Sequence, residues 1–271
     1  MGRDGETQSS PGWGGEKPRS ALSGPTPIAD AIVPPHEGEG ECRDCSFQPC
    51  MLEGLMSSPR AYQAFLFDMD GTLITSTAAA ERVWSRWAER HGLDVEAFIP
   101  TVHGVRAIDT IRRQNLPDID LDAEVAWVER GEIEDVEGVA PVPGAVEFVK
   151  RLPPDRWALV TSASVPLARV RLKAAGVEPP DILITAEDVE RGKPDPAGYL
   201  KAAEALGFAV ADCLVFEDAE AGIQAGEAAG ADVVVLTAAW THPLETTHPT
   251  LKDYDDARLE VGADGRLRLE I

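Results

Sequence analysis

The chain has 271 residues, of which 44% are hydrophobic, and this is enough to fill the core of one large domain. Its 47 acidic residues outnumber its 25 Lys and Arg residues, which gives a formal net charge of −22. Such a field repels the phosphates of nucleic acids and anionic membrane surfaces, so we expect neither as a partner. Any site for a small anion must therefore supply its own local cations.

The first part of the chain differs in composition from the rest. Residues 1–58 are rich in Gly, Pro, Ser and Glu and lack apolar periodicity, so we interpret them as a disordered N-terminal tail. Three cysteines in this segment, Cys42, Cys45 and Cys50, have metal-like spacing. A zinc site with His36 as the nearest fourth ligand is the alternative to a reduced, unstructured segment. The longest apolar runs of the chain are only strand-sized, which indicates a cytoplasmic protein.

After the tail, five near-continuous apolar runs predict buried parallel strands. They cover residues 64–67, 157–160, 213–216 and 233–236, with 182–184 as the weakest. Helical patterns between these runs end at glycines, namely Gly176, Gly207 and Gly230. The alternation predicts an α/β fold with a doubly wound, Rossmann-like parallel sheet. Apolar alternation around Asp264-Gly265 predicts a C-terminal hairpin at a sheet edge.

About 80 residues without a strand pattern separate the first two predicted strands, far more than a crossover needs. We therefore predict that residues 78–142 form an inserted α-helical cap. The α/β core then consists of residues 59–77 and 143–271. Helical patterns in the cap end at His91 or run near 105–115 and 121–131.

Asp68 and Asp70 directly follow the first predicted strand, at the edge where ligands of open α/β sheets bind. Two carboxylates spaced by two residues on an extended backbone point to the same side and repel each other unless a cation lies between them. Gly71 permits the sharp turn that leaves both at the rim. The pattern predicts a divalent metal, since a turn built on Asp70-Gly71 alone would not explain Asp68.

Polar pairs follow two other predicted strands, Thr161-Ser162 and Glu217-Asp218. The carboxylates suit a hard ion that prefers oxygen ligands, such as Mg²⁺. Each pair could instead cap the helix that follows it. Lys193 lies in a rigid Gly-Lys-Pro turn before a helix and is either a solvated surface residue or the local cation that this acidic chain needs.

Four motifs in this order resemble those of the haloacid dehalogenase superfamily of phosphatases, over residues 62–250 or so. They are Asp68-x-Asp70-Gly-Thr, Thr161, Lys193 and Glu217-Asp218. Further segments, for example His103-Gly-Val-Arg106, resemble one branch of this superfamily. That branch contains 2-deoxyglucose-6-phosphate phosphatases, glycerol-phosphate phosphatases and bacterial sugar-phosphatases. The resemblance implies a Mg²⁺-dependent phosphomonoester hydrolase whose partner is a small sugar or polyol phosphate.

The resemblance also implies a role for each catalytic residue. Asp68 would attack phosphorus and form an aspartyl-phosphate. Asp70 would protonate the leaving alkoxide and later deprotonate the attacking water. Thr161 and Lys193 would bind the remaining phosphoryl oxygens.

The implied metal ligands are Asp68, the main-chain carbonyl of Asp70, and Asp218, with Glu217 helping from the same loop. Four further residues are expected to bind substrate, namely His103, Arg106, Gly71 and Ser162. His103 and Arg106 are the candidates from the cap, because a Gly-containing loop can place them over the metal site. Solvated polar residues at a helix start are the alternative for this pair.

Other reactions of the superfamily call for residues that this chain lacks. Hydrolytic dehalogenases that resemble this core lack the second aspartate of the first motif, whereas this chain has Asp70 at that position. Phosphonate hydrolases need a cap lysine, and no Lys occurs between Gly71 and Val149. Phosphoglucomutase-like phosphotransferases, the first alternative, carry a cap histidine where this chain has Ala80. A non-catalytic phosphate or metal sensor, the second alternative, would not need Asp70.

Overall fold

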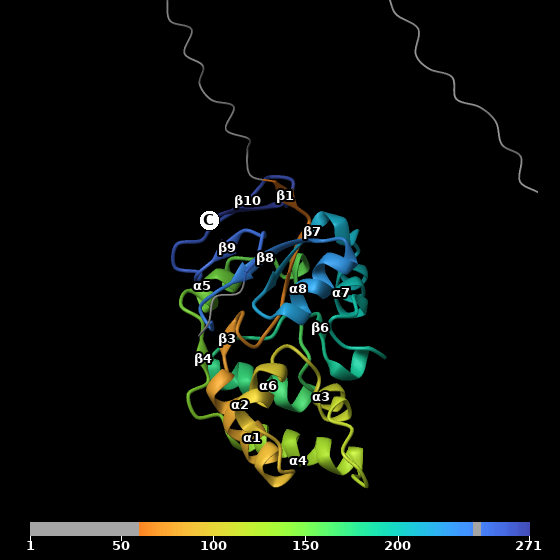
Figure 1. Cartoon of the computed structure of the whole chain (residues 1–271). Helices are drawn as coiled ribbons and strands as arrows, with labels where there is room; N and C mark the ends of the chain where they lie inside the picture. The colour runs from red at the N-terminus through yellow and green to blue at the C-terminus, as the bar shows by residue number, and fades with distance from the viewer. Residues whose placement is uncertain (1–59, 241–244) are drawn as a thin grey trace, which may run out of the picture. The chain divides into compact units, whose positions relative to one another are not determined.

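The computed structural model describes residues 60–240 and 245–271. The predicted tail, with Cys42, Cys45 and Cys50, lies outside the described residues. A six-stranded sheet, parallel throughout, forms the centre of the described part (Figure 1). In spatial order its strands are β6 (Leu183–Ile184), β5 (Trp157–Val160), β2 (Ala64–Phe67), β7 (Cys213–Glu217), β8 (Asp232–Leu236) and β9 (Thr250–Leu251).

Both faces of this sheet are covered, which is why its strands have near-continuous apolar sequences. Side chains alternate along β2, so Phe65 and Phe67 pack into the cluster on one face while Ala64 and Leu66 pack into the cluster on the other. Helices α5 and α6 contribute to the first cluster and α7 and α8 to the second. Their bounds are α5 (Ala145–Lys150), α6 (Val165–Ala175), α7 (Ala197–Leu206) and α8 (Glu220–Ala229). The predicted doubly wound fold is confirmed.

The predicted C-terminal hairpin is present as β10 (Arg258–Val261) and β11 (Leu267–Glu270). It does not extend the central sheet, whose edge is occupied by β9. Instead β11 pairs with β1 (Ala61–Tyr62) in a separate antiparallel sheet of three strands. The buried Leu267 and Leu259 join the core cluster on the α5 and α6 face, and this burial draws the hairpin inward.

The segment between β2 and β5 folds mainly into helices that share a hydrophobic cluster of their own. They are α1 (Thr77–Arg90), α2 (Val95–Phe98), α3 (Ala107–Arg113) and α4 (Leu121–Glu134). The cluster is built around Trp84, Trp87 and Phe98, whose rings lie in edge or tilted contact. Figure 1 shows these helices gathered beyond one end of the sheet. The exact bounds of a cap domain, 78–142, stay a prediction.

The chain enters and leaves this helical unit at adjacent points. Strand β3 (Ile74–Thr75) pairs in antiparallel fashion with β4 (Ala140–Pro141), so the two connections lie side by side. Four 3-10 turns complete the described structure, at Ile99–Thr101, Pro154–Arg156, Ala186–Asp188 and Val210–Asp212. Within the described ranges, no helix has both the length and the apolar character needed to span a membrane.

Candidate active site

The carboxyl ends of three central strands bring polar side chains to one place. Strand β2 lies between β5 and β7 in parallel register, so Asp68, Thr161 and Glu217 end up at the same edge. The main chain of Asp68 continues the ladder, because its N–H donates to the carbonyl of Phe216 over 2.9 Å. Asp68 is only 5% exposed, so its carboxylate needs compensation from the protein or from a bound cation.

Lys193 provides that compensation from the loop before α7. Its ammonium group forms an ion pair with Asp68, donates to Glu217 over 2.6 Å and donates to the carbonyl of Val160 over 3.1 Å. Tyr199 on α7 donates its hydroxyl to the same oxygen of Glu217 over 2.7 Å. Lys193 itself is buried. Of the two alternatives that the sequence left open for Lys193, a solvated surface position does not agree with this geometry.

The electrostatics of this buried cluster follow from its excess of carboxylates. Burial is the main cause that raises the pKa of Asp68; Lys193 opposes it, Glu217 and Asp70 reinforce it, and the net result is a pKa of about 8. Burial alone would lower the pKa of Lys193, but Asp68 and Glu217 outweigh it, so the pKa of Lys193 is raised and the ammonium stays charged. Burial and the charge of Asp68 raise the pKa of Asp218 as well. A further cation would relieve this repulsion.

Asp68, Glu217 and Asp218 can hold such a cation. One carboxylate oxygen from each lies within 4.8 Å of the others. Two glycines keep room for these carboxylates: a Cβ atom at Gly71, where φ is +92°, would lie 1.9 Å from a carboxylate oxygen of Asp218. A Cβ atom at Gly222 would lie 1.7 Å from a carboxylate oxygen of Glu217. An all-oxygen set of this kind fits Mg²⁺.

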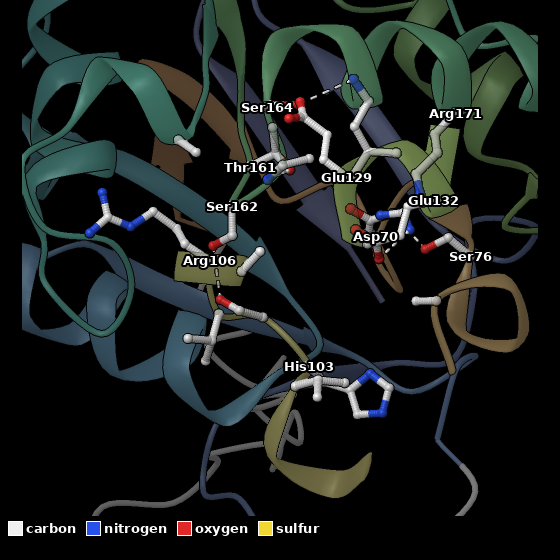
Figure 2. A pocket seen from close by; sticks show the side chains of 18 of the residues that line it. Asp70, Ser76, His103, Arg106, Glu129, Glu132, Thr161, Ser162, Ser164 and Arg171 are labelled. Atoms are coloured by element: carbon white, nitrogen blue, oxygen red, sulfur yellow. Dashed lines mark hydrogen bonds and ion pairs between the residues drawn. The ribbon is translucent and has the colours of Figure 1, made fainter. Parts of the chain in front are cut away.

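Asp70 stands beside this cluster and is held by two side chains. Ser76 donates its hydroxyl to Asp70 over 2.5 Å, and Arg171 of α6 donates to the same oxygen over 3.1 Å. Arg171 also forms an ion pair with Glu132 of α4 at 3.1 Å. Figure 2 shows Asp70, Ser76, Glu132 and Arg171 gathered together. The orientation of Asp70 thus depends on the segment leading into α1 and on the helix α6.

A cavity of about 170 Å³ opens over these groups, between the sheet edge and the helices α1, α3 and α4. Of the residues expected from the sequence, seven line it: Asp68, Asp70, Thr161, Ser162, His103, Arg106 and Asp218. Lys193 and Gly71 do not line this cavity. Lys193 contacts Asp68, and Gly71 packs against Asp218.

The two residues expected to bind substrate from the cap, Arg106 and His103, both contact other protein groups. Arg106 donates to the main-chain carbonyls of Val189 and Glu190 over 3.0 and 3.1 Å and forms an ion pair with Asp109 at 2.7 Å. Its guanidinium therefore joins the start of α3 to the core loop before α7, and Figure 2 shows it directed away from Asp70. His103 lies 3.4 Å from Glu81 and is partly exposed.

The helix-capping alternatives for the polar pairs do not agree with the structure. The N-cap of α6 is Ser164, whose side chain accepts from the N–H of Leu167, while the Thr161 hydroxyl accepts from the N–H of Ala163. Ser162 instead donates to the carbonyl of Gly104 over 2.9 Å, which links the core to the loop before α3. Helix α8 begins after Ala219 and has no side-chain cap.

Sequence reasoning missed several polar residues that line the cavity, among them Ser76, Glu129, Glu132 and Arg171. None of them belongs to a local motif. Ser76 precedes a helix and reads as a cap, and the other three lie inside helical patterns where charged residues usually face solvent. Only the packing of α4 against α6 brings Glu132 to Arg171.

The chain is similar to known hydrolases in sequence and in structure. The model of the haloacid dehalogenase-like hydrolases matches residues 62–230. The chain is 43% identical to hexitol phosphatase A of Escherichia coli (strain K12) over 197 residues, which are 71% of this chain and 88% of that protein. It is 35% identical to 2-deoxyglucose-6-phosphate phosphatase 1 of Saccharomyces cerevisiae over 198 residues, which are 65% and 80% of the two chains. The crystal structure of a hydrolase from Pseudomonas syringae is similar with a TM-score of 0.57 and 27% identity, over 65% of this chain and 85% of that one.

Proposed function

The chain belongs to the haloacid dehalogenase-like hydrolases, and we propose that it hydrolyses the phosphomonoester of a small sugar or polyol through an aspartyl-phosphate on Asp68. The observation that carries this proposal is the position of Asp68, which is buried at the end of β2, paired with Lys193 and next to Asp70 in one cavity. A covalent intermediate divides one difficult displacement into two easier ones.

In the first step a carboxylate oxygen of Asp68 attacks phosphorus and the ester bond to the alcohol breaks. Thr161 lines the cavity beside Asp68, so its hydroxyl can donate to a phosphoryl oxygen. Lys193, which is paired with Asp68 and Glu217, offsets part of the negative charge around the phosphoryl group. Positioning and charge stabilisation are the main demands of phosphoryl transfer, and these fixed groups supply them.

Asp70 acts on the other side of the transferred group. It gives a proton to the leaving alkoxide, and in the second step it takes a proton from the water that attacks the aspartyl-phosphate. Ser76 and Arg171 fix one of its oxygens, which leaves the other oxygen free to face the cavity. The two donors keep the carboxyl group in place through both proton transfers.

Asp68, Glu217 and Asp218 are the side chains that would hold Mg²⁺. When bound, the ion would neutralise charge on the phosphoryl oxygens. Tyr199 keeps Glu217 in place by its hydrogen bond. Trp240 donates its indole N–H to the carbonyl of Asp218 over 2.8 Å and so fixes the main chain of that ligand.

We assign the helices α1 to α4 to a cap of residues 78–142 on a core of 59–77 and 143–271, and three of them, α1, α3 and α4, form the far wall of the cavity. This wall faces the alcohol part of the ester. The similarity to a hexitol phosphatase and to a 2-deoxyglucose-6-phosphate phosphatase supports an alcohol with several hydroxyl groups.

The test is a screen for phosphate release from a panel of polyol and sugar phosphates with Mg²⁺. We expect release of inorganic phosphate from at least one hexitol or hexose phosphate, together with loss of release in the Asp68→Asn variant. Transfer of the phosphoryl group to another sugar hydroxyl, without release, would instead support the phosphoglucomutase-like alternative. Binding of phosphate without turnover of any ester would support the sensor.

A further inference from the structure

One wall of the cavity is unusually acidic for a site that receives a phosphate ester. Glu129 and Glu132 lie three residues apart on α4, so they are on the same face of that helix. Both line the cavity, and Figure 2 shows them beside Asp70 and Arg171. The hydroxyl of Ser164 donates to Glu129. The rest of this wall contains apolar side chains, among them Trp84 and Val125.

The one cation among these groups, Arg171, is already shared. Its side chain is 5% exposed, and its two terminal nitrogens donate to Asp70 and Glu132 over 3.1 Å each. Its buried Nε has no hydrogen-bond partner among the described residues. Two carboxylates on one guanidinium leave an excess of negative charge, and Glu129 adds to it. The guanidinium therefore has little attraction left for an anion in the cavity.

The position of Glu129 and Glu132 indicates which part of the substrate they contact, given the proposed function. The phosphoryl group would lie at Asp68 and Thr161, and the leaving oxygen would lie at Asp70. Arg171 and Glu132 follow Asp70 in an unbroken chain of contacts. The carbons attached to the leaving oxygen therefore extend toward Glu132 and Glu129.

We propose that Glu129 and Glu132 determine specificity by accepting hydrogen bonds from hydroxyl groups of a neutral alcohol and by repelling an alcohol that carries a second negative charge. Carboxylates are pure acceptors, so they suit the hydroxyls of a polyol or sugar. A carboxylate or second phosphate on the substrate would meet like charges in a half-buried cavity, where water screens them poorly.

Two matched pairs of substrates test this inference. Glycerol 3-phosphate and 3-phosphoglycerate differ in one carbon, which is a hydroxymethyl group in the first and a carboxylate in the second. Sorbitol 6-phosphate and 6-phosphogluconate differ in the same way on a longer chain. For each pair, the ratio of the two kcat/KM values measures discrimination against the negative charge. Because both values come from one preparation, partial misfolding of a variant does not change the ratio.

The variants are Glu132→Gln, Glu129→Gln and, as a matched control, Glu134→Gln. Glu134 lies on the same helix but is exposed and does not line the cavity. We expect the wild-type protein to prefer the neutral member of at least one pair. The preference should fall roughly tenfold in Glu132→Gln and in Glu129→Gln, partly through a gain on the anionic substrate, and stay unchanged in Glu134→Gln.

Hydrolysis of p-nitrophenyl phosphate separates failure of this inference from failure of the proposed function. Equal ratios in the wild-type protein and both cavity variants would overturn the inference, while hydrolysis of the aryl ester would leave the phosphatase activity standing. A wild-type preference for the anionic members would also overturn it. If the wild-type protein hydrolysed no ester at all, the proposed function would fail, and the inference with it.

Discussion

The ammonium nitrogen of Lys193 lies 2.6 Å from Glu217 and is also paired with Asp68, so a single buried cation joins two carboxylates that come from neighbouring strands. Removing one member of a buried ion pair is costly, because the remaining charges have neither water nor a partner. Lys193 is therefore placed to affect both the stability of the fold and the chemistry at Asp68.

Lys193→Ala should lower kcat/KM for a sugar phosphate and for an aryl phosphate together, since both esters depend on the charge around Asp68. It should also lower the free energy of unfolding by about 3 to 5 kcal/mol in metal-free protein. Steady-state kinetics and denaturant unfolding measure the two effects. The control is Lys201→Ala, which removes a half-exposed lysine of α7. Undiminished turnover of the aryl ester in Lys193→Ala would remove this lysine from the catalytic proposal.

Asp68→Asn should abolish turnover and leave the fold intact, because the amide has nearly the shape of the carboxylate but is a poor nucleophile. Phosphate release and thermal unfolding check the two halves of this expectation. Asp122→Asn, an exposed position on α4, is the control for loss of one negative charge. More than a few per cent of residual activity in Asp68→Asn would argue against the covalent mechanism.

A chelator should stop hydrolysis, and added Mg²⁺ should restore it, because the carboxylates of Asp68, Glu217 and Asp218 outnumber the one ammonium of Lys193 and need a further cation. Mg²⁺ should also raise the thermal unfolding temperature, since a ligand that binds the folded state stabilises it. The rise should be smaller in Asp218→Asn. Full activity in an excess of chelator would contradict the metal assignment.

Arg106→Ala tests whether this arginine contacts substrate or joins the helical unit to the core. Its guanidinium is occupied by Asp109 and by the carbonyls of Val189 and Glu190, so we expect kcat/KM to fall by a similar factor for a sugar phosphate and an aryl phosphate. Hydrogen bonds of charged groups contribute about 1.5 to 3 kcal/mol each. A loss confined to the sugar phosphate would show instead that Arg106 binds the leaving group.

Glu124 tests the stability of the helical unit and its dependence on pH. The carboxylate accepts from Trp87, Arg90 and His91 over 2.8, 2.7 and 3.0 Å. Burial alone would raise the pKa of Glu124, but these partners outweigh it and hold the pKa below the ordinary value of 4.5. The lowered pKa means that the carboxylate stabilises the fold above about pH 4.5, and that this contribution is lost as the pH falls through the folded-state pKa.

Glu124→Gln should therefore be less stable than the wild-type protein at neutral pH, and the difference should shrink as the pH is lowered below 4.5. Denaturant unfolding at a series of pH values measures this. The control is Glu96→Gln, which changes an exposed carboxylate of the same helical unit. A stability difference that stays constant with pH would mean that the charge of Glu124 contributes nothing.

Local patterns explain what could be predicted from the sequence. Strand β2 was predictable because four apolar residues run directly into Asp68 and Asp70, and the parallel direction of the other strands follows from the α/β alternation. The sixth strand, β9, was not predictable, because its two residues are too few to show a pattern. The hairpin at Gly265 was predictable from its alternation, but its partner β1 lies about 200 residues away along the chain and could not be inferred locally.

For the candidate site, the sequence could not predict the direction in which long side chains point. The position of Arg106 at the start of a helix near the cavity was correctly expected, yet the sequence does not say toward which side a long side chain turns. Arg171 and Glu132 each occupy a helix interior, where a charged residue usually faces water. Their pairing depends on how two helices from different parts of the chain pack, and that is a tertiary property.

The paired strands β3 and β4 have a consequence for how this fold diversifies. Because Ile74 stands opposite Pro141 and Thr75 opposite Ala140, the chain enters and leaves the segment between them through one narrow ladder. A segment held in this way can be lengthened, shortened or replaced without shifting the register of β2 against β5 and β7. The helical segment can thus be exchanged between related proteins and change which alcohol is recognised, while the groups that act on phosphorus keep their geometry.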